Sequence, residues 1–334
     1  MGERMKLLLL LVLFMAPGMV GAGPVAADRA LAATGPVAAD RPGSATSPFP
    51  YENSRYIMID GAELHFRFWF PEPGQHRGSV LLIHGFSAST YSWQAAAEHM
   101  QAMGFEVVAI DIPPFGYSDK SPRLNQSNTA RARHVRNFLE QAFPGRKWHI
   151  SGHSMGGAIA QAFALMYPEQ LHSVTFVAGA LFSSVNENQV RGRGILSAWP
   201  VRNIAGRFAR SYIITPGRVE NLLESAYGKP PGREQVQAYL KPLKIPGTAT
   251  AILASSRNST EILSLQASEL DVPSLAIWGT RDRWVPFESR KDALDMMPGI
   301  EIQRIEGAGH NPQETHLEEF LAVWTRFIES LDPL

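Results

Sequence analysis

A serine between two glycines, where a strand pattern changes into a helix pattern, constrains the fold of this chain more than any other feature. Residues 148–151 have strand character, the sequence Gly152-His-Ser-Met-Gly156 follows, and residues 158–166 are apolar and alanine-rich, as in a buried helix. A serine on so tight a turn is held in a strained conformation, and only glycine leaves room at positions 152 and 156. The pattern predicts a strand–turn–helix unit that presents Ser154 as a nucleophile, with Met155 at the positive end of the helix.

Alternating strand-like and helix-like segments predict the rest of the fold. The first two strands form a hairpin turned at Asp60-Gly61, and the later strands are continuous apolar runs, as in a parallel sheet covered by helices on both faces. The expected strands are residues 55–59, 64–70, 79–83, 106–110, 148–151, 173–177, 274–278 and 301–305. The expected helices outside residues 183–269 are 90–103, 128–143, 155–166, 287–297 and 314–331. This order predicts an α/β fold with a mostly parallel, eight-stranded sheet flanked by helices.

Composition limits the chemistry that this chain can perform. The 334 residues carry no formal net charge and include no cysteine. A neutral chain gives no reason to expect nucleic acid as a partner, and the lack of cysteine excludes disulfides, thiol catalysis and cysteine-bound metals. Neither a phosphate-binding loop nor a Gly-x-Gly-x-x-Gly nucleotide turn is present in the sequence. We therefore expect neither a metal nor a cofactor.

The first 50 residues form two segments outside the expected fold. Residues 1–22 combine a positive start, a short apolar core and small residues at the end, which predicts a signal peptide and export to the periplasm or medium. The apolar core is shorter than the ~20 residues that span a membrane, and an uncleaved membrane anchor is the alternative. Residues 23–50 are rich in Ala, Pro and Gly and repeat Gly-Pro-Val-Ala-Ala-Asp-Arg, which favours a disordered linker.

Five motifs, in one order, resemble those of the α/β-hydrolase superfamily from about residue 51 to the C-terminus. They are His84-Gly-Phe86, Asp111 to Ser118, Gly152 to Gly157, Gly279 to Pro286 and Gly307 to Pro312. The resemblance implies an α/β-hydrolase fold whose catalytic domain comprises residues 51–182 and 270–334. It also implies a helical cap, or lid, inserted after the sixth strand, which we expect at residues 183–269.

The resemblance implies a catalytic triad in the chain order serine, acid, base. Ser154 needs a base because a free hydroxyl is a weak nucleophile, and His310, in the loop after the last strand, is the expected base. Asp282, four residues after the strand that ends at Trp278, is the expected carboxylate that orients this histidine. The loop 178–182, the other place where some relatives carry the acid, has no carboxylate.

The tetrahedral intermediate of acyl transfer needs two preorganised donors, which together are called the oxyanion hole. The N–H of Met155 is one expected donor, and the resemblance implies that the N–H of Phe86 is the other. The turn from Asp111 to Ser118 is expected to support the site without a catalytic role, and His316, within the final helix pattern, is expected to be a surface or capping residue. The remaining histidines that we expect to be structural are His84, His134, His149 and His172.

The expected cap has two features with open interpretations. Its aromatic residues either line an apolar acyl or alcohol pocket or pack among themselves; they are Trp199, Phe208, Tyr212, Tyr227 and Tyr239. Between Ser183 and Ser268 eleven Lys and Arg residues face five Glu, an excess of six positive charges (11 − 5). These cations either lie on solvated helix faces or weakly attract an anionic substrate or lipid surface. The arginines of this group without nearby acids are Arg191, Arg193, Arg202, Arg207 and Arg210.

We expect an exported, cofactor-independent serine hydrolase that cleaves small apolar carboxylic esters through an acyl-enzyme. Carbon–carbon bond hydrolysis, acyl transfer and perhydrolysis remain alternatives because related enzymes use the same triad. Dehalogenases and epoxide hydrolases of this superfamily use an aspartate nucleophile, and the serine at position 154 argues against both. A non-catalytic ligand receptor is the hypothesis from another class, and the presence of all three triad residues argues against it.

Overall fold

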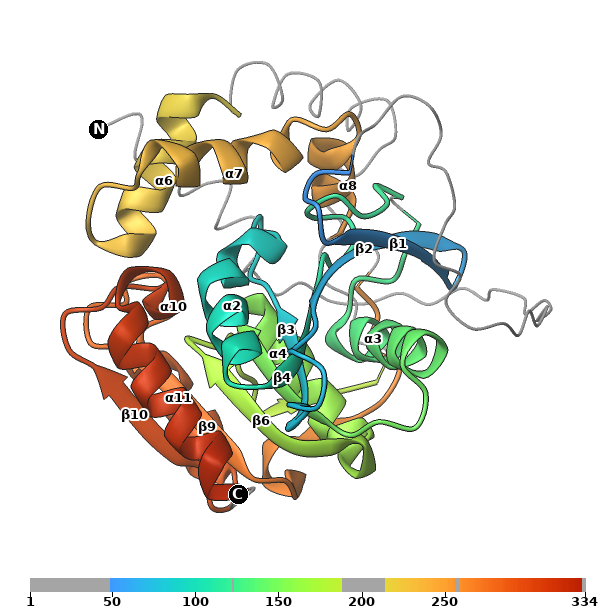
Figure 1. The fold of residues 1–334 in the computed structure, drawn as a ribbon, viewed down its shortest axis with the longest axis vertical. Coiled ribbons are helices and arrows are strands. Elements are labelled where there is room, and N and C mark those ends of the chain that lie inside the picture. The colour runs from blue at the N-terminus through green and yellow to red at the C-terminus, as the bar shows by residue number, and fades with distance from the viewer. Residues whose placement is uncertain (1–48, 122, 188–213, 256–258, 332–334) are drawn as a thin grey trace.

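The computed structural model describes residues 49–121, 123–187, 214–255 and 259–331. Eight strands in these residues form one sheet, as predicted, in the order β1-β2-β4-β3-β5-β6-β9-β10 (Figure 1). Strands β1 and β2 pair antiparallel, β2 also pairs antiparallel with β4, and every later pair is parallel. The bounds are β1 Ser54–Ile59, β2 Ala62–Trp69, β3 Gly78–Ile83, β4 Phe105–Ile110, β5 Trp148–His153, β6 Leu171–Val177, β9 Ser274–Gly279 and β10 Glu301–Ile305.

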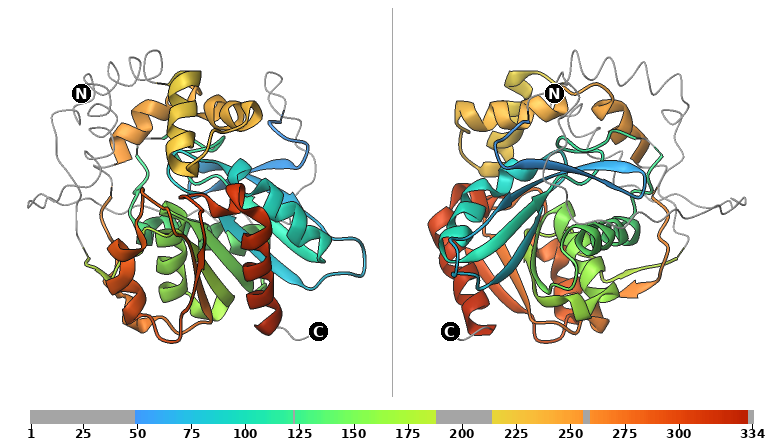
Figure 2. Two further views of the ribbon diagram at one scale, coloured as in Figure 1. Left: turned by 90° about the vertical axis from the view of Figure 1, so that its left-hand side faces the viewer. Right: turned by 45° about the vertical axis from the view of Figure 1, so that its right-hand side comes forward.

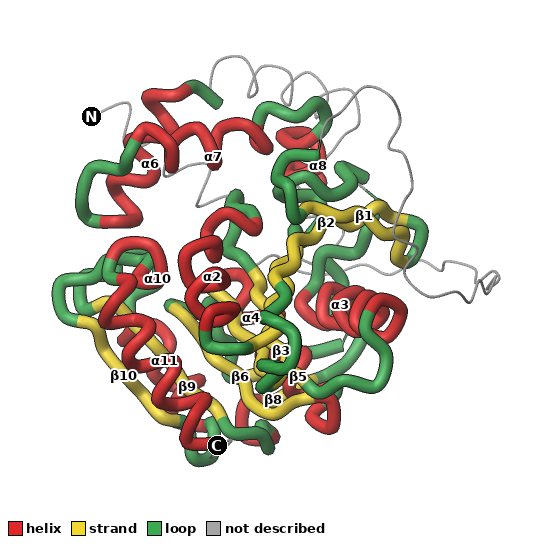
Figure 3. Tube along the Cα trace, in the orientation of Figure 1, coloured by secondary structure: helices red, strands yellow, loops and turns green. Residues whose placement is uncertain are grey.

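Helices cover both faces of this sheet (Figure 3). One face packs against α3 (Asn128–Ala142), α4 (Met155–Met166) and α9 (Lys291–Met296), and the other packs against α2 (Gln94–Ala102) and α11 (Leu317–Leu331). Strands β4, β5 and β9 are buried along their whole length, and the sequences of β4 and β9 are accordingly mainly apolar without alternation. The sheet is therefore a rigid platform whose carboxyl-terminal edge carries the loops of interest.

Three helices between β6 and β9 form a cap on one side of the molecule (Figure 2). They are α6 (Pro216–Tyr227), α7 (Arg233–Leu243) and α8 (Thr248–Ser255). Apolar side chains of α6, α7 and α8 pack in one cluster with Ala88 and Phe115, from the loops after β3 and β4. A two-stranded sheet of β7 (Ser184–Val185) and β8 (Leu265–Gln266) joins the two ends of the insertion.

The prediction of one final helix over residues 314–331 is wrong, because the structure has two helices there. A short helix, α10 (Pro312–Thr315), begins two residues earlier than expected, with proline in its first turn. His316 has non-helical dihedral angles (φ −132°, ψ 55°), and its carbonyl accepts the first hydrogen bond of α11. The break turns the chain, so that Phe320 and Trp324 of α11 pack against the sheet. His316 therefore lies between helices and not within one.

Some predictions fall on residues outside those that the structure describes. The expected signal peptide, nearly all of the linker and the cap arginines 191–210 lie there, as do Trp199, Phe208 and Tyr212. In the described ranges, no helix is both long and apolar enough to cross a bilayer.

Candidate active site

Ser154 occupies the sharp turn between β5 and α4. Its backbone has φ 52° and ψ −113°, a conformation that is costly for a residue with a side chain. Three backbone hydrogen bonds over-determine it: its N–H donates to the carbonyl of Val177 at 2.9 Å, and its own carbonyl accepts from Gly157 at 2.9 Å and Ala180 at 2.8 Å. The strained serine is therefore fixed by the strand on one side and the helix on the other.

The glycines around this turn are required by close backbone contacts. A Cβ atom on Gly152 would lie 2.2 Å from the carbonyl oxygen of Gly156, and one on Gly156 would lie 2.2 Å from the carbonyl oxygen of Ile83. Side-chain contacts between carbon and oxygen do not occur at such distances, so any larger residue would force the backbone to move. The glycines allow the start of α4 to approach the ends of β3 and β5.

Asp282 and His310 are hydrogen-bonded to each other in the buried loops after β9 and β10. The Nδ1 atom of His310 lies 2.8 Å from Oδ2 of Asp282. The other carboxylate oxygen accepts backbone N–H bonds from Trp284 at 2.8 Å and Val285 at 3.0 Å. Because β9 and β10 are parallel neighbours, their carboxyl ends bring these two loops together. The Asp282 carboxylate is thus held rigid and presents one oxygen to the imidazole.

His153, which the sequence reasoning did not single out, links the serine turn to the loop of His310. Its ring centroid lies 4.8 Å from that of His310, and its Nε2 donates to the His310 carbonyl at 2.9 Å. Burial and the neighbouring His310 hold the pKa of His153 well below its usual value, so it is a neutral donor. Its place between Gly152 and Ser154 was the available signal, because the residue before the nucleophile must face the neighbouring loops.

Trp284 is a second residue that the sequence reasoning missed. Its ring stacks on His310 with centroids 5.6 Å apart and an interplanar angle of 22°. The indole therefore covers part of the imidazole and limits its rotation. Its position two residues after Asp282, inside a matched motif, was the available signal.

The loop that contains Phe86 lies directly against the serine turn. A Cβ atom on Gly85 would be 2.8 Å from Nδ1 of His153 and 3.2 Å from Cβ of Ser154. The Phe86 ring is partly exposed and contacts Phe115 edge-on, with centroids 5.0 Å apart. Met155 is the first residue of α4, whose opening N–H groups lack helical partners. The two expected oxyanion donors thus belong to segments on either side of Ser154.

His84 is buried beneath this loop as a neutral structural residue. Its Nε2 accepts the N–H of Ile112 at 3.0 Å, and its Nδ1 donates to the carbonyl of Gly85 at 2.6 Å. Burial lowers the pKa of His84, which agrees with a ring that donates from one nitrogen and accepts at the other. The other histidines expected to be structural contact polar or aromatic neighbours away from Ser154; they are His134, His149 and His172.

A second Ser–His–Asp arrangement is present, and it is completely buried. His65 lies 2.8 Å from Oγ of Ser54 through Nε2 and 2.7 Å from Oδ2 of Asp111 through Nδ1. All three residues are 0% exposed, so no substrate reaches the Ser54 hydroxyl. Asp111 also accepts the N–H groups of Thr90 and Tyr117. This network fixes the loops after β3 and β4 around the serine turn, in the supporting role expected for Asp111.

The apolar cluster of the cap packs against residues that neighbour Ser154 and Asp282. Met155 contacts both the main core and the cluster formed by the cap helices, and Trp284 contacts that same cluster. The cluster includes Phe115, Val219, Leu223 and Ile252. The cap therefore contacts the neighbourhood of Ser154 mainly through hydrocarbon side chains.

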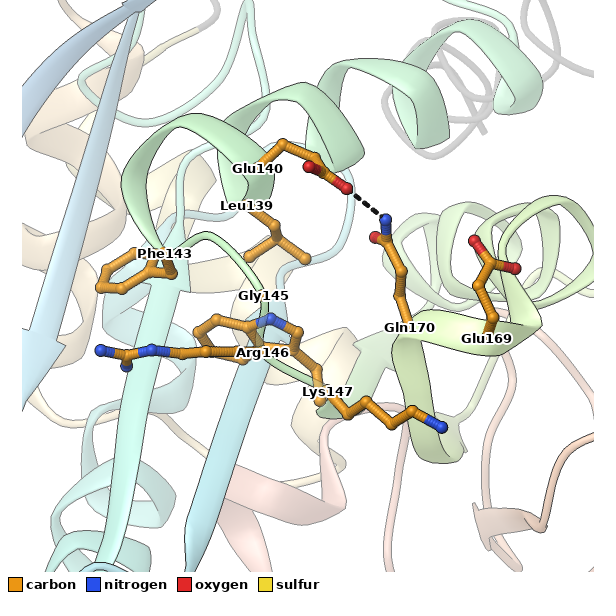
Figure 4. Close-up of a pocket in the computed structure, with 9 residues that line it drawn as sticks. Leu139, Glu140, Phe143, Gly145, Arg146, Lys147, Glu169 and Gln170 are labelled. Atoms are coloured by element: carbon orange, nitrogen blue, oxygen red, sulfur yellow. Dashed lines mark hydrogen bonds between the residues drawn. The ribbon is translucent and has the colours of Figure 1, made fainter. Parts of the chain in front are cut away.

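A separate surface pocket lies at the other end of β5 (Figure 4). It is bordered by the end of α3 and by residues 145–148 and 169–170, with Trp148 at the amino end of β5. Ser154 follows the carboxyl end of the same strand, so this pocket is remote from the serine turn. In the part of the chain that the structure describes, no group of three His, Asp or Glu side chains is placed to hold a metal ion.

Comparisons with known proteins agree with this architecture. A 2-hydroxy-6-oxononadienedioate/2-hydroxy-6-oxononatrienedioate hydrolase of Burkholderia vietnamiensis is 24% identical over 290 residues, which are 82% of this chain and 95% of that protein. A membrane phospholipase A, described as a bacterial virulence factor, has a similar structure with TM-score 0.64, 23% identity and coverage of 84% and 87% of the two chains. An esterase from Exiguobacterium antarcticum has TM-score 0.64, 17% identity and coverage of 82% and 98%.

These similarities place hydrolases that are named for different substrates on one fold. The sequence itself matches the family described as alpha/beta hydrolase fold over residues 78–317, which is well over half of the chain. That span includes Ser154, Asp282 and His310. The chain belongs to the α/β-hydrolase family.

Proposed function

We propose that this protein is a serine hydrolase that cleaves carboxylic esters of apolar acids or alcohols through an acyl-enzyme. The observation that carries the proposal is the buried hydrogen bond between Asp282 and His310, next to a serine held on a strained turn. A carboxylate bound to one ring nitrogen keeps the proton there and leaves the other nitrogen free to take the proton of the nucleophile.

In the proposed reaction His310 removes the hydroxyl proton of Ser154 as the oxygen attacks the ester carbonyl. The N–H groups of Met155 and Phe86 stabilise the resulting oxyanion. His310 then returns the proton to the leaving alcohol, and the acyl group stays on Ser154. Water, deprotonated by His310, attacks the acyl-enzyme and releases the acid, which regenerates the free serine.

The apolar border of the site supports an ester with a hydrocarbon acyl or alcohol group. The cap cluster that packs against Met155 and Trp284 consists of apolar side chains, among them Phe115, Leu223 and Ile252. Each buried CH₂ of a substrate contributes about 0.8 kcal/mol of transfer free energy, so chain length should affect the rate measurably. Export, by the signal peptide expected at residues 1–22, is part of the proposal and would place the enzyme outside the cytoplasm.

Carbon–carbon bond hydrolysis is the second candidate, and it is favoured by the name of the Burkholderia relative, a hydrolase of a dienedioate. A dioate carries two carboxylates, which need cationic partners in the site. Lys120 is a partly buried cation near the cap, but its Nζ already donates to the carbonyls of Phe115 and Gly116. The apolar border and the engaged lysine make the ester the better-supported substrate.

The proposal predicts that Ser154→Ala abolishes both ester hydrolysis and covalent labelling by a fluorophosphonate. Removing a triad nucleophile costs about 10⁶-fold in kcat, although the oxyanion donors leave a residual rate above that of water. The measurement is hydrolysis of p-nitrophenyl esters of graded chain length, with labelling followed by mass spectrometry of intact protein and peptides.

Ser54→Ala is the matched control, because it removes the hydroxyl of the buried Ser–His–Asp network. That variant should be labelled with the same stoichiometry as the wild type. Near-normal turnover in Ser154→Ala, or a label on a peptide without Ser154, would refute the proposal. A carbon–carbon hydrolase would instead give a higher kcat/KM on a 2-hydroxy-6-oxo-dienoate than on every ester tested.

A further inference from the structure

The last turn of cap helix α6 is hydrogen-bonded directly to the loop that carries His310. The final carbonyls of a helix have no partner within it. In α6 the carbonyl of Ala226 accepts the backbone N–H of His310 at 2.7 Å. The approach is so close that a Cβ atom on Gly309 would lie 2.4 Å from the same carbonyl oxygen. The backbone of the proposed base is thus supported from the cap as well as from the sheet.

One carboxylate, that of Glu314 in α10, joins the cap helices α6 and α7 to this loop. Its Oε2 accepts the hydroxyl of Tyr227, the last residue of α6, at 2.8 Å. Its Oε1 accepts the hydroxyl of Tyr239 of α7 at 2.7 Å and the side-chain amide of Asn311, the neighbour of His310, at 2.8 Å. The two tyrosines are only 2% and 7% exposed. Three donors from three segments therefore converge on one side chain.

The loop of the proposed acid is tied to the same turn of α6. The indole Nε1 of Trp284 donates to Oγ of Ser225 at 3.2 Å, and the ring of Trp284 stacks on His310. Ser225, Ala226 and Tyr227 are consecutive, so one turn of α6 contacts both loops. Burial raises the pKa of the Glu314 carboxyl to about 7, against the opposite effect of its three donors. Loss of a hydrogen bond to this poorly hydrated carboxyl, or to one of its donors, costs free energy because water does not replace the lost partner.

We propose that Glu314 is a positioning residue for His310, which it holds in register with Asp282 and Ser154 by pinning the loop to Tyr227 and Tyr239. The inference rests on the proposed function, because it needs His310 to act as the base. It implies that α6 and α7 are a fixed part of the catalytic frame. Substrate then enters and leaves without these two helices lifting from the site.

The test compares Glu314→Ala with Glu314→Gln on a short p-nitrophenyl ester. Alanine removes all three contacts, and we expect kcat to fall about 10²-fold, because small misplacements of a catalytic group have effects of that size. KM should change less than about threefold, since no group that binds substrate is removed. Glutamine can accept from Tyr239 and Asn311 and donate to the oxygen of Tyr227, so it should restore kcat to within about fivefold of the wild type.

Glu261→Ala is the matched control for a merely structural loss. Glu261 is also a buried glutamate with three donors, the N–H groups of Asn128 and Thr129 and the Thr129 hydroxyl, at the start of α3. Both alanine variants should lower the melting temperature, but only Glu314→Ala should lower kcat strongly. Equal kcat losses in the two variants, or no rescue by glutamine, would overturn the inference.

Single hydroxyl deletions keep the test decisive if Glu314→Ala does not fold. Tyr227→Phe and Tyr239→Phe should each lower kcat and the rate of fluorophosphonate labelling. Their effects should be non-additive in the double variant, because both act through one carboxylate. Labelling at the wild-type rate in both single variants would contradict the inference, whereas a wild-type protein that is never labelled would contradict the proposed function.

Discussion

The two oxygens of the Asp282 carboxylate have different roles: one anchors the side chain to the backbone, and the other orients His310. One oxygen is fixed by the N–H groups of Trp284 and Val285, and this leaves the other aimed at Nδ1 of His310. His153 and Trp284 border the imidazole on its other sides, one as a neutral donor and one as a stacked ring. The orientation of His310 therefore depends on three side chains, two from the loop after β9 and one from the end of β5, and only one of them is the acid.

Asp282→Asn tests the tautomer control at the residue scale. The amide oxygen of asparagine can still accept from Trp284 and Val285, which places its NH₂ group toward His310. The imidazole nitrogen on that side must then accept, so its proton moves to the nitrogen that should serve as the base. We expect a folded protein whose kcat is about 10⁴-fold lower, measured by steady-state ester hydrolysis. A loss smaller than tenfold would mean that another carboxylate orients the base.

Between β5 and α4 the packing of whole elements decides which residues are tolerated. Gly152 and Gly156 let the first turn of α4 approach the carbonyls at the ends of β5 and β3. Gly279 has a similar role at the end of β9, where a Cβ atom would lie 2.2 Å from the carbonyl of Gly309. Three strand ends and the loops that follow them thus meet at backbone-to-backbone distances. A rigid site results because few side chains intervene that could change rotamer.

Gly156→Ala tests this close approach at the scale of the element. The added methyl group would overlap the Ile83 carbonyl, so α4 must shift away from β3. We expect a loss of about 3 kcal/mol or more in the free energy of unfolding, together with a large drop in fluorophosphonate labelling. The measurements are urea unfolding and labelling rate.

The control for this substitution is Gly217→Ala in the first turn of α6. An added Cβ atom there meets nothing within 4 Å, and the residue is exposed. That change should leave labelling intact and alter stability by no more than about 1 kcal/mol, in the stabilising direction. If the two substitutions had equal effects, the tight packing of α4 would not be the cause.

At the scale of the whole molecule, the carboxyl group of Glu314 links the cap to the sheet domain. Burial raises the pKa of Glu314 to about 7 from an ordinary 4.5. The folded state therefore binds a proton more tightly than the unfolded state does. This contribution to stability is fully present below about pH 4.5 and is lost as the pH rises through about 7. Tyr227, Tyr239, Lys229 and His310 belong to the segments packed around this carboxyl.

The stability difference between wild type and Glu314→Gln should therefore depend on pH. We expect the wild type to lose up to about 3 kcal/mol relative to the variant between pH 4.5 and 7, with no further change above that range. Urea unfolding at intervals of half a pH unit measures the difference, and contributions from other groups cancel. A difference that is constant or increases with pH would show that Glu314 does not titrate in this way.

The sequence alone determined the architecture, because hydrophobic runs and glycines act locally. The apolar runs of β3, β4 and β9 reflect burial on both faces, and the sequence Gly152-His-Ser-Met-Gly156 reflects a turn with room only for glycine at its two ends. Ser154, Asp282 and His310 were predicted from motifs that follow strand ends and from the family resemblance; the structure brings Asp282 and His310 into contact, and the catalytic roles stay a prediction. The division of the last helix at His316 was missed, because a helical pattern does not reveal where the chain must turn to reach the core.

Only the tertiary structure decided how the site is held together. His153, Trp284 and Glu314 contact partners up to 157 residues away in the chain, as in the bond from His153 to His310. No local pattern encodes such a partner, because a buried polar side chain is satisfied by whichever segment the fold brings to it. The same is true of Ser54, His65 and Asp111, which have the composition of a triad and yet are sealed in the core. Burial, a property of the whole fold, separates that structural network from the proposed active site.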